Sequence, residues 1–146
     1  MATTFTQAQG GKSAALITMS TLGSGTYIAS AAIDLGATIP MDVTVEVEVT
    51  PSTTPTLNKQ LVVFAQLSLD NSVYGSGPTS GTSTADERDL HWIGTVPVAS
   101  TGTHRKFFSL SGLPVTRYLK LIVKNDLGVT LTSGFVYKAD ITGVGT

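Results

Sequence analysis

The chain has 146 residues, a formal net charge of −1 and only 13% charged residues. This is the length of one domain, and the charge gives no electrostatic footprint for nucleic acid or an anionic membrane. Cysteine is absent, which excludes a disulfide framework, a thiolate zinc site and a cysteine nucleophile. No signal peptide or membrane-spanning stretch is recognisable, so synthesis in a cytoplasm is expected.

Met1 to Ser13 is a small, polar segment in which Phe5 is the one large apolar residue. Such a segment cannot build a core, so the chain divides into an N-terminal arm, 1–13, and a β-sandwich domain, 14–146. We expect the arm to be mobile in an isolated copy and to be ordered by a neighbouring subunit, with Phe5 as its anchor. The alternative, an arm folded along its own sandwich, stays open.

Two strands are predicted next, over 14–21 and 26–35, with the turn Gly23-Ser24-Gly25 between them. The clearest strand follows at Asp42 to Thr50, where valine occupies every second position and Thr or Glu the positions between. Successive side chains of a strand point to opposite faces, so one face here is apolar and the other polar. This alternation predicts a half-buried antiparallel strand.

Gln60 to Leu69 is a nearly continuous apolar run. One predicted face carries Leu61, Val63, Ala65, Leu67 and Leu69, and the other carries Val62 and Phe64. We therefore expect a central strand that is covered on both sides at one end. The next segment, Asp70 to Arg88, is rich in Gly, Ser and Thr and contains Tyr74 and Pro78. Loops of this length are usually functional or disordered.

Four more strands are predicted at 90–98, 103–110, 117–124 and 134–142, with turn signals between them. The total is about eight strands and no helix. The predicted fold class is all-β: a single antiparallel β-sandwich that resembles a jelly roll, with an extended N-terminal arm.

Motifs that carry chemistry are weak. Gly11-Lys12-Ser13 matches the end of a phosphate-binding loop, but Thr6 stands where the first glycine is needed and no helix follows. In an extended strand Glu87, Asp89 and His91 share a face, yet neighbours on that face are about 7 Å apart. A solvated strand start, with Arg88 balancing its neighbours, is the favoured reading, and a calcium site is the alternative.

No enzyme class fits the sequence. A catalytic triad would have to use His91 or His104, and no nucleophile-elbow or metalloprotease signature is present. We expect no enzymatic activity, no cofactor and no metal. Trp92, Tyr74 and Tyr137 are candidates for stacking on sugar rings, but Trp92 lies within an apolar strand, so core packing is favoured for it.

The second half of the chain resembles small β-sandwich structural proteins of tailed bacteriophage virions, which decorate or cement the capsid. The segments that carry the resemblance are Asp89–Val98, Thr101–Thr103, Phe107–Val115 and Arg117–Asn125, with Ala32–Ala37 and Ala65–Asp70 upstream. It covers about three-quarters of the chain, omits the arm, and is a pattern of strands and turns without a chemical signature.

The resemblance implies a jelly-roll protein, made in the host cytoplasm and located in the virion, that bridges capsid subunits. Its implied partners are the major capsid protein and copies of itself, with a trimer as one option, and neither nucleic acid nor membrane. The residues proposed to contact partners lie in the arm and the long loop: Phe5, Lys12, Tyr74, Pro78 and Arg88. Two alternatives remain, a tail or fibre component and a carbohydrate-binding module that attaches to a host glycan.

Overall fold

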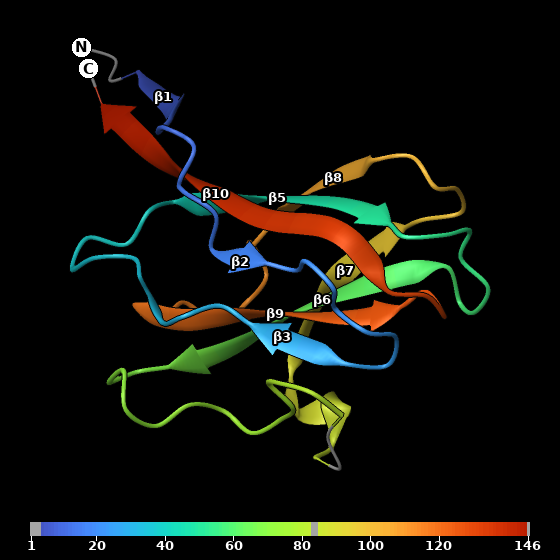
Figure 1. Cartoon of the computed structure of the whole chain (residues 1–146). Helices are drawn as coiled ribbons and strands as arrows, with labels where there is room; N and C mark the ends of the chain where they lie inside the picture. Colours follow the sequence, from blue (N-terminus) through green and yellow to red (C-terminus); the bar gives the residue numbers. More distant parts are fainter. Residues whose placement is uncertain (1–3, 83–84, 146) are drawn as a thin grey trace.

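The computed structural model describes residues 4–82 and 85–145, and within them it contains ten strands, one 3₁₀ turn and no α-helix (Figure 1). The elements are β1 (Phe5–Gln9), β2 (Ile17–Thr18), β3 (Tyr27–Ala29), β4 (Ile33–Asp34), β5 (Asp42–Pro51), β6 (Gln60–Ser68), η1 (Glu87–Asp89), β7 (His91–Pro97), β8 (His104–Ser109), β9 (Tyr118–Asp126) and β10 (Leu131–Gly145). The all-β prediction is confirmed. The strands exceed the expected eight because the arm contains β1 and the segment 26–35 divides into β3 and β4.

Two antiparallel sheets form the sandwich. In the first sheet β10 lies between β5 and the N-terminal strands β1 and β2, and β8 forms the far edge. In the second sheet β9 lies between β6 and the short strands β3 and β4, and β7 forms the far edge. The chain crosses between the sheets repeatedly, so each sheet combines strands from both halves of the sequence. This is the strand order of a jelly roll.

The valines of β5 form the centre of the core, as the alternation predicts. Val45, Val47 and Val49 are completely buried between the sheets. On the outer face of the same strand, Glu46 forms ion pairs with Lys12 and with Arg105, at 3.2 and 2.9 Å. The period of the sequence therefore separates a dry face from a charged face across one strand.

Strand β6 is buried on both faces. Val62 and Phe64 belong to a second, smaller cluster on the outer face of the second sheet, with Tyr27, Leu90 and Ile122. The prediction for Leu69 was wrong, since this side chain is 84% exposed. The strand ends at Ser68, whose hydroxyl accepts the N–H groups of Asp70 and Asn71 and turns the chain away from the core.

Of the two arrangements predicted for the arm, this chain adopts the second, because the arm lies along its own sandwich. Strand β1 pairs with the end of β10, from Phe5 opposite Gly145 to Gln9 opposite Ile141. The pairing continues as single hydrogen bonds, such as Ser13 N–H to the Lys138 carbonyl at 2.8 Å. All five residues of β1 are nevertheless exposed, so the division into an arm and a sandwich domain stays a prediction.

Candidate interaction surface

The two ends of the sandwich differ. One end, called the ribbon end, is formed by residues 35–41, 69–75 and 110–117 and by the ribbon, which is β1 paired with the last residues of β10. Figure 1 shows this ribbon projecting beyond the other strands. The opposite end, called the closed end, is formed by the connections 19–26, 52–59, 98–103 and 127–130.

A buried polar group seals the closed end. Asn125 is fully buried, and its amide Nδ2 donates to the carbonyls of Leu22 and Val129, both at 2.9 Å. Its Oδ1 accepts the N–H of Leu127 at 3.0 Å. One side chain thus satisfies three backbone groups from two connections, and the adjacent Leu127 side chain is completely buried.

Exposed apolar side chains gather at the ribbon end. Among the described residues, ten large hydrophobic side chains are exposed, and seven of them belong to this end: Phe5, Ile39, Met41, Leu69, Val73, Val115 and Val144. Single exposed apolar residues are ordinary, but a cluster at one end of a domain is typical of a surface that meets another protein.

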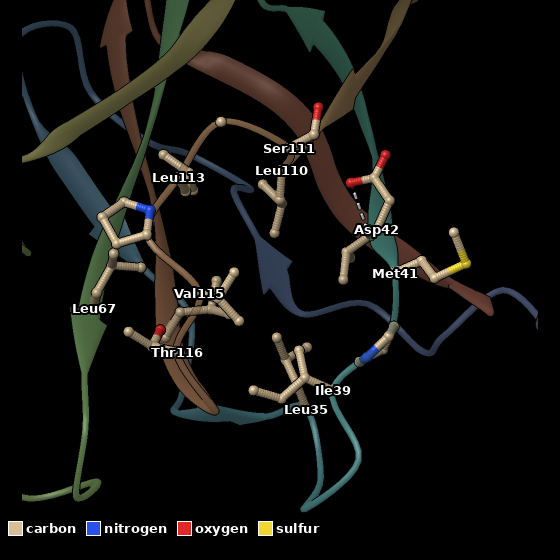
Figure 2. Close-up of a pocket in the computed structure, with 15 residues that line it drawn as sticks. Leu35, Ile39, Met41, Asp42, Leu67, Leu110, Ser111, Leu113, Val115 and Thr116 are labelled. Atoms are coloured by element: carbon tan, nitrogen blue, oxygen red, sulfur yellow. Dashed lines mark hydrogen bonds between the residues drawn. The ribbon is translucent and has the colours of Figure 1, made fainter. Parts of the chain in front are cut away.

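A hollow of about 240 Å³ opens among these side chains. Figure 2 shows Ile39, Leu110 and Val115 converging on it from two different segments. The charged residue of the lining is Asp42, and its carboxylate already accepts the N–H of Val43 at 2.7 Å and the hydroxyl of Ser109 at 2.5 Å. The hollow therefore suits an aliphatic or aromatic side chain and offers little to a charged ligand.

An ion pair fixes the two segments that border the hollow. Arg117 Nε donates to Asp34 Oδ1 at 2.7 Å, and the same oxygen accepts the N–H of Gly36 at 2.8 Å. The Arg117 guanidinium, followed by the Gly36 N–H, holds the pKa of Asp34 at about 2. Gly36 has φ of +91°, a conformation that favours glycine. The apolar residues around the hollow are thus presented by a turn held through polar contacts.

A second, shallower hollow of about 510 Å³ lies beside the first and shares Leu67, Pro114 and Thr116 with it. Asp70 shapes its rim, because Oδ1 of this residue accepts the N–H groups of Ser72 and Val73, both at 2.9 Å. These hydrogen bonds, the one from Val73 first, lower the pKa of Asp70. The turn satisfies its backbone internally, and Val73 is left pointing outward.

The remainder of the long loop covers the outer face of the second sheet. Glu87 accepts hydrogen bonds from the Tyr27 hydroxyl and from Lys124 Nζ, the latter at 2.8 Å. Burial opposes ionisation of Glu87, but the two hydrogen bonds and the Lys124 charge outweigh it, so its pKa is lowered. Leu90 packs beneath this segment. This part of the loop acts as a cover for a small second core.

The expected extended geometry at Glu87, Asp89 and His91 was wrong. Residues 87–89 form a 3₁₀ turn, because the Asp86 carboxylate caps the N–H of Arg88 at 3.0 Å. Glu87 is engaged by Tyr27 and Lys124, so it does not point with its neighbours toward a common site. Within residues 4–82 and 85–145 no group of three or more His, Asp or Glu side chains is placed to hold a metal ion.

The five residues predicted to contact partners are not brought together. Phe5 is 77% exposed at the tip of the ribbon, and Lys12 lies on the outer face of the first sheet with Nζ 3.9 Å from the centre of the Tyr137 ring. Tyr74 borders the second hollow, Pro78 is buried within the loop, and Arg88 is exposed and paired with Asp86 at 2.7 Å. Their role in partner contact stays a prediction.

Sequence reasoning missed the apolar hollow, although two short motifs signal it. Ile39-Pro40-Met41 and Leu113-Pro114-Val115 each place a proline between two large apolar residues. Proline cannot donate to a strand ladder, so such a segment forms a connection rather than a central strand. Its apolar neighbours then remain at the surface or line a hollow.

The prediction that Trp92 packs in the core was wrong. Trp92 is 62% exposed on the edge strand β7. The pairing of β6 with β7 shifts between Val63 and Phe64, so that Trp92 lies opposite Phe64 on the outer face. Of the other proposed stacking residues, Tyr74 lies under Lys120 Nζ at 4.3 Å and Tyr137 under that of Lys12. A glycan site would therefore depend on Trp92.

Comparisons with known proteins add little. No family model matches the chain, and no curated protein matches it. A chain from the cryo-electron-microscopy structure of broad bean stain virus is similar over 98% of this chain and 89% of that chain, with 9% identity and a TM-score of 0.35. A likeness at this level supports no inference about function. No helix among the described residues is long and apolar enough to span a membrane.

Proposed function

We propose that the protein is a non-enzymatic structural component of a virion, a capsid decoration or cement protein that attaches by its ribbon end. The resemblance to phage decoration proteins suggests the class. The observation that carries the assignment is the gathering of exposed apolar side chains, an apolar hollow and a projecting ribbon at one end of a jelly roll whose other end is sealed.

Attachment takes place through apolar contact. An apolar side chain of the major capsid protein enters the hollow between Ile39 and Val115, and the ribbon and the rim around Val73 add further contact. Each contact is modest, but repeated copies on a particle that share contacts gain strong retention from multivalency. The low charge of the chain keeps the cost of desolvating such an interface small.

The proposal is tested with one substitution at each end. Val115→Asp places a charge at the mouth of the hollow, and Leu57→Asp places the same charge on an exposed leucine of the closed end. Electron microscopy of particles assembled with each variant then measures occupancy. We expect loss of occupancy for Val115→Asp and wild-type occupancy for Leu57→Asp. Equal occupancy of both variants would remove the ribbon end as the attachment surface.

The arm is tested separately. Deletion of residues 2–12 removes β1 and the Lys12 contacts to Glu46 and Tyr137. We expect this deletion to abolish capsid binding, whereas unchanged occupancy would assign attachment to the hollow alone. A tail or fibre component, the second reading, differs by position, since microscopy of intact particles would then place the protein outside the capsid shell.

A further inference from the structure

Strand β1 is held by one neighbour and contributes nothing to the core. Its five residues pair only with Ile141–Gly145, and all five are exposed. Strand β5 begins at Asp42, which lies opposite Ile141, so residues 142–145 extend beyond the start of β5 and have no partner in that strand. The ribbon is therefore two-stranded over most of its length. Isolated two-stranded ribbons are marginally stable in water.

Beyond β1 and the Gly10 N–H, which donates to the Asp140 carbonyl at 2.8 Å, the arm is anchored to its own copy from Lys12 onward. Lys12 pairs with Glu46, and Ser13 and Lys138 exchange hydrogen bonds, with Ser13 N–H donating at 2.8 Å and Ser13 Oγ accepting at 3.0 Å. Between this anchor and β1 lie Gly10 and Gly11, and the space around the β-carbon position of Gly11 is open. Because glycine adopts many backbone conformations, Gly11 can redirect β1 without disturbing the anchor, and the Gly10 hydrogen bond to Asp140 is released together with β1.

The ribbon also leaves apolar surface uncovered. Phe5 lies over Gly145, since a β-carbon at Gly145 would be 3.2 Å from Cε1 of the ring, yet most of the ring faces solvent. Val144, which pairs with Thr6, is exposed on the other face of the ribbon. In a single copy each face of the ribbon therefore carries an exposed apolar side chain. A second ribbon of the same sequence supplies matching apolar side chains at the same place.

From these observations we propose that β1 is an exchangeable strand: residues 5–9 of one copy pair with Ile141–Gly145 of a second copy. Exchange regains every backbone pairing that it breaks, because donor and acceptor sequences are identical. It brings two ribbons together, where the faces that carry Phe5 become covered. The inference rests on the proposed function in one respect: a particle holds many copies close together, and this high local concentration favours exchange.

The absence of cysteine makes a direct test possible. Ala8 and Thr142 are cross-strand partners in the ribbon, and antiparallel partners have Cα separations that a disulfide accepts. Purified Ala8→Cys and Thr142→Cys single variants, one of them labelled with ¹⁵N, are mixed and oxidised, and mass spectrometry identifies the covalent dimers. We expect the mixed dimer to exceed each homodimer by roughly tenfold, because only an exchanged strand places these two residues side by side.

Thr44→Cys and Ser109→Cys, cross-strand partners in β5 and β8, are the matched control pair. These strands belong to the body of the first sheet, so a mixture of these variants should give no excess of mixed dimer. The Ala8→Cys/Thr142→Cys double variant gives a second readout. We expect covalent dimers or closed rings that increase with protein concentration. Only internally bridged monomer at every concentration, with no mixed dimer from the single variants, would overturn the proposal.

The experiment separates this inference from the proposed function. It uses purified protein and contains no capsid, so exchange can be present even if particles show no occupancy. Conversely, wild-type occupancy by the internally bridged double variant, together with an absence of mixed dimer, would leave the attachment role intact and refute exchange.

Discussion

The closed end and the ribbon end of the sandwich solve the same problem in opposite ways. Both must terminate two sheets whose inner faces are apolar. The closed end does so with Asn125, which satisfies three backbone groups while Leu127 fills the space beside it. The ribbon end leaves a hollow and places Ile39, Met41 and Val115 at the surface. The closed end therefore contributes more to stability, and the ribbon end offers more apolar surface to a partner.

The contrast between the two ends predicts that the largest loss in the free energy of unfolding follows a substitution of Asn125. Asn125→Leu keeps the number and branching of the heavy atoms but leaves the Val129 carbonyl and the Leu127 N–H without partners, and leaves the Leu22 carbonyl with the Leu131 N–H alone. Each unpaired buried group costs about 1–3 kcal/mol, so we expect a loss of about 3–5 kcal/mol in the free energy of unfolding, measured by urea denaturation. Asn58→Ala at the same end removes an exposed hydrogen bond to Asp126 and should cost less than about 1 kcal/mol. Similar losses for both variants would show that the buried network does not close this end.

Leucine truncation at the two ends gives the next largest difference. Leu127 is completely buried, and Leu127→Ala should cost about 2–5 kcal/mol, which for a domain of this size lowers Tm by roughly 6–15 °C. Leu113 lines the hollow and is only partly buried, so Leu113→Ala enlarges an existing space and should cost about 1 kcal/mol. Calorimetry of both variants measures the contrast. An equal fall in Tm would mean that the ribbon end is packed as tightly as the closed end.

Much of the fold could be predicted from the sequence, because period-two alternation is a local signal. The valines of β5 and the two-sided burial of β6 follow directly from it. What failed depended on contacts between distant residues. Nothing near Trp92 reports the register shift between β6 and β7 that places this ring outside, and nothing near Glu87 reports Tyr27 or Lys124.

The ribbon end was the least predictable region for the same reason. Its hollow is assembled from Leu35, Ile39 and Val115. The first two residues lie far from Val115 in the sequence, and the topology brings the two segments together. The arm was predicted to need a neighbour because its own sequence offers no core residues besides Phe5. Its order comes from the unusual length of β10, which reaches Gly145 and provides an edge for β1.

The loop that covers the second sheet should resemble the closed end in contributing stability, and pH tests this. The pKa of Glu87 is lowered from its usual value of 4.5 in the folded chain. Its stabilising contribution is therefore fully present above the unfolded value and is lost as the pH falls through the lower, folded value. We expect the urea midpoint to fall between about pH 5.5 and pH 3, and to fall less in Glu87→Gln.

Asp34 and Asp70 also have lowered pKa values, so the wild type and Glu87→Gln must be compared at each pH and the difference between them taken as the result. A difference that stays constant over this range would mean that the ion pair with Lys124 does not hold the cover in place.

The smallest effect is expected at Val115, and it tests the comparison most directly. Its side chain is 78% exposed, so Val115→Ser should change the free energy of unfolding by no more than about 0.5 kcal/mol. Val45→Ser, which puts a hydroxyl into the completely buried core, should cost several times more. Urea denaturation measures both, and light scattering should show less self-association for Val115→Ser because the exposed apolar patch is smaller. A loss above about 1 kcal/mol at Val115 would mean that this residue supports the fold. The ribbon end would then be a second sealed end, with its apolar surface already used within the chain and unavailable to a partner.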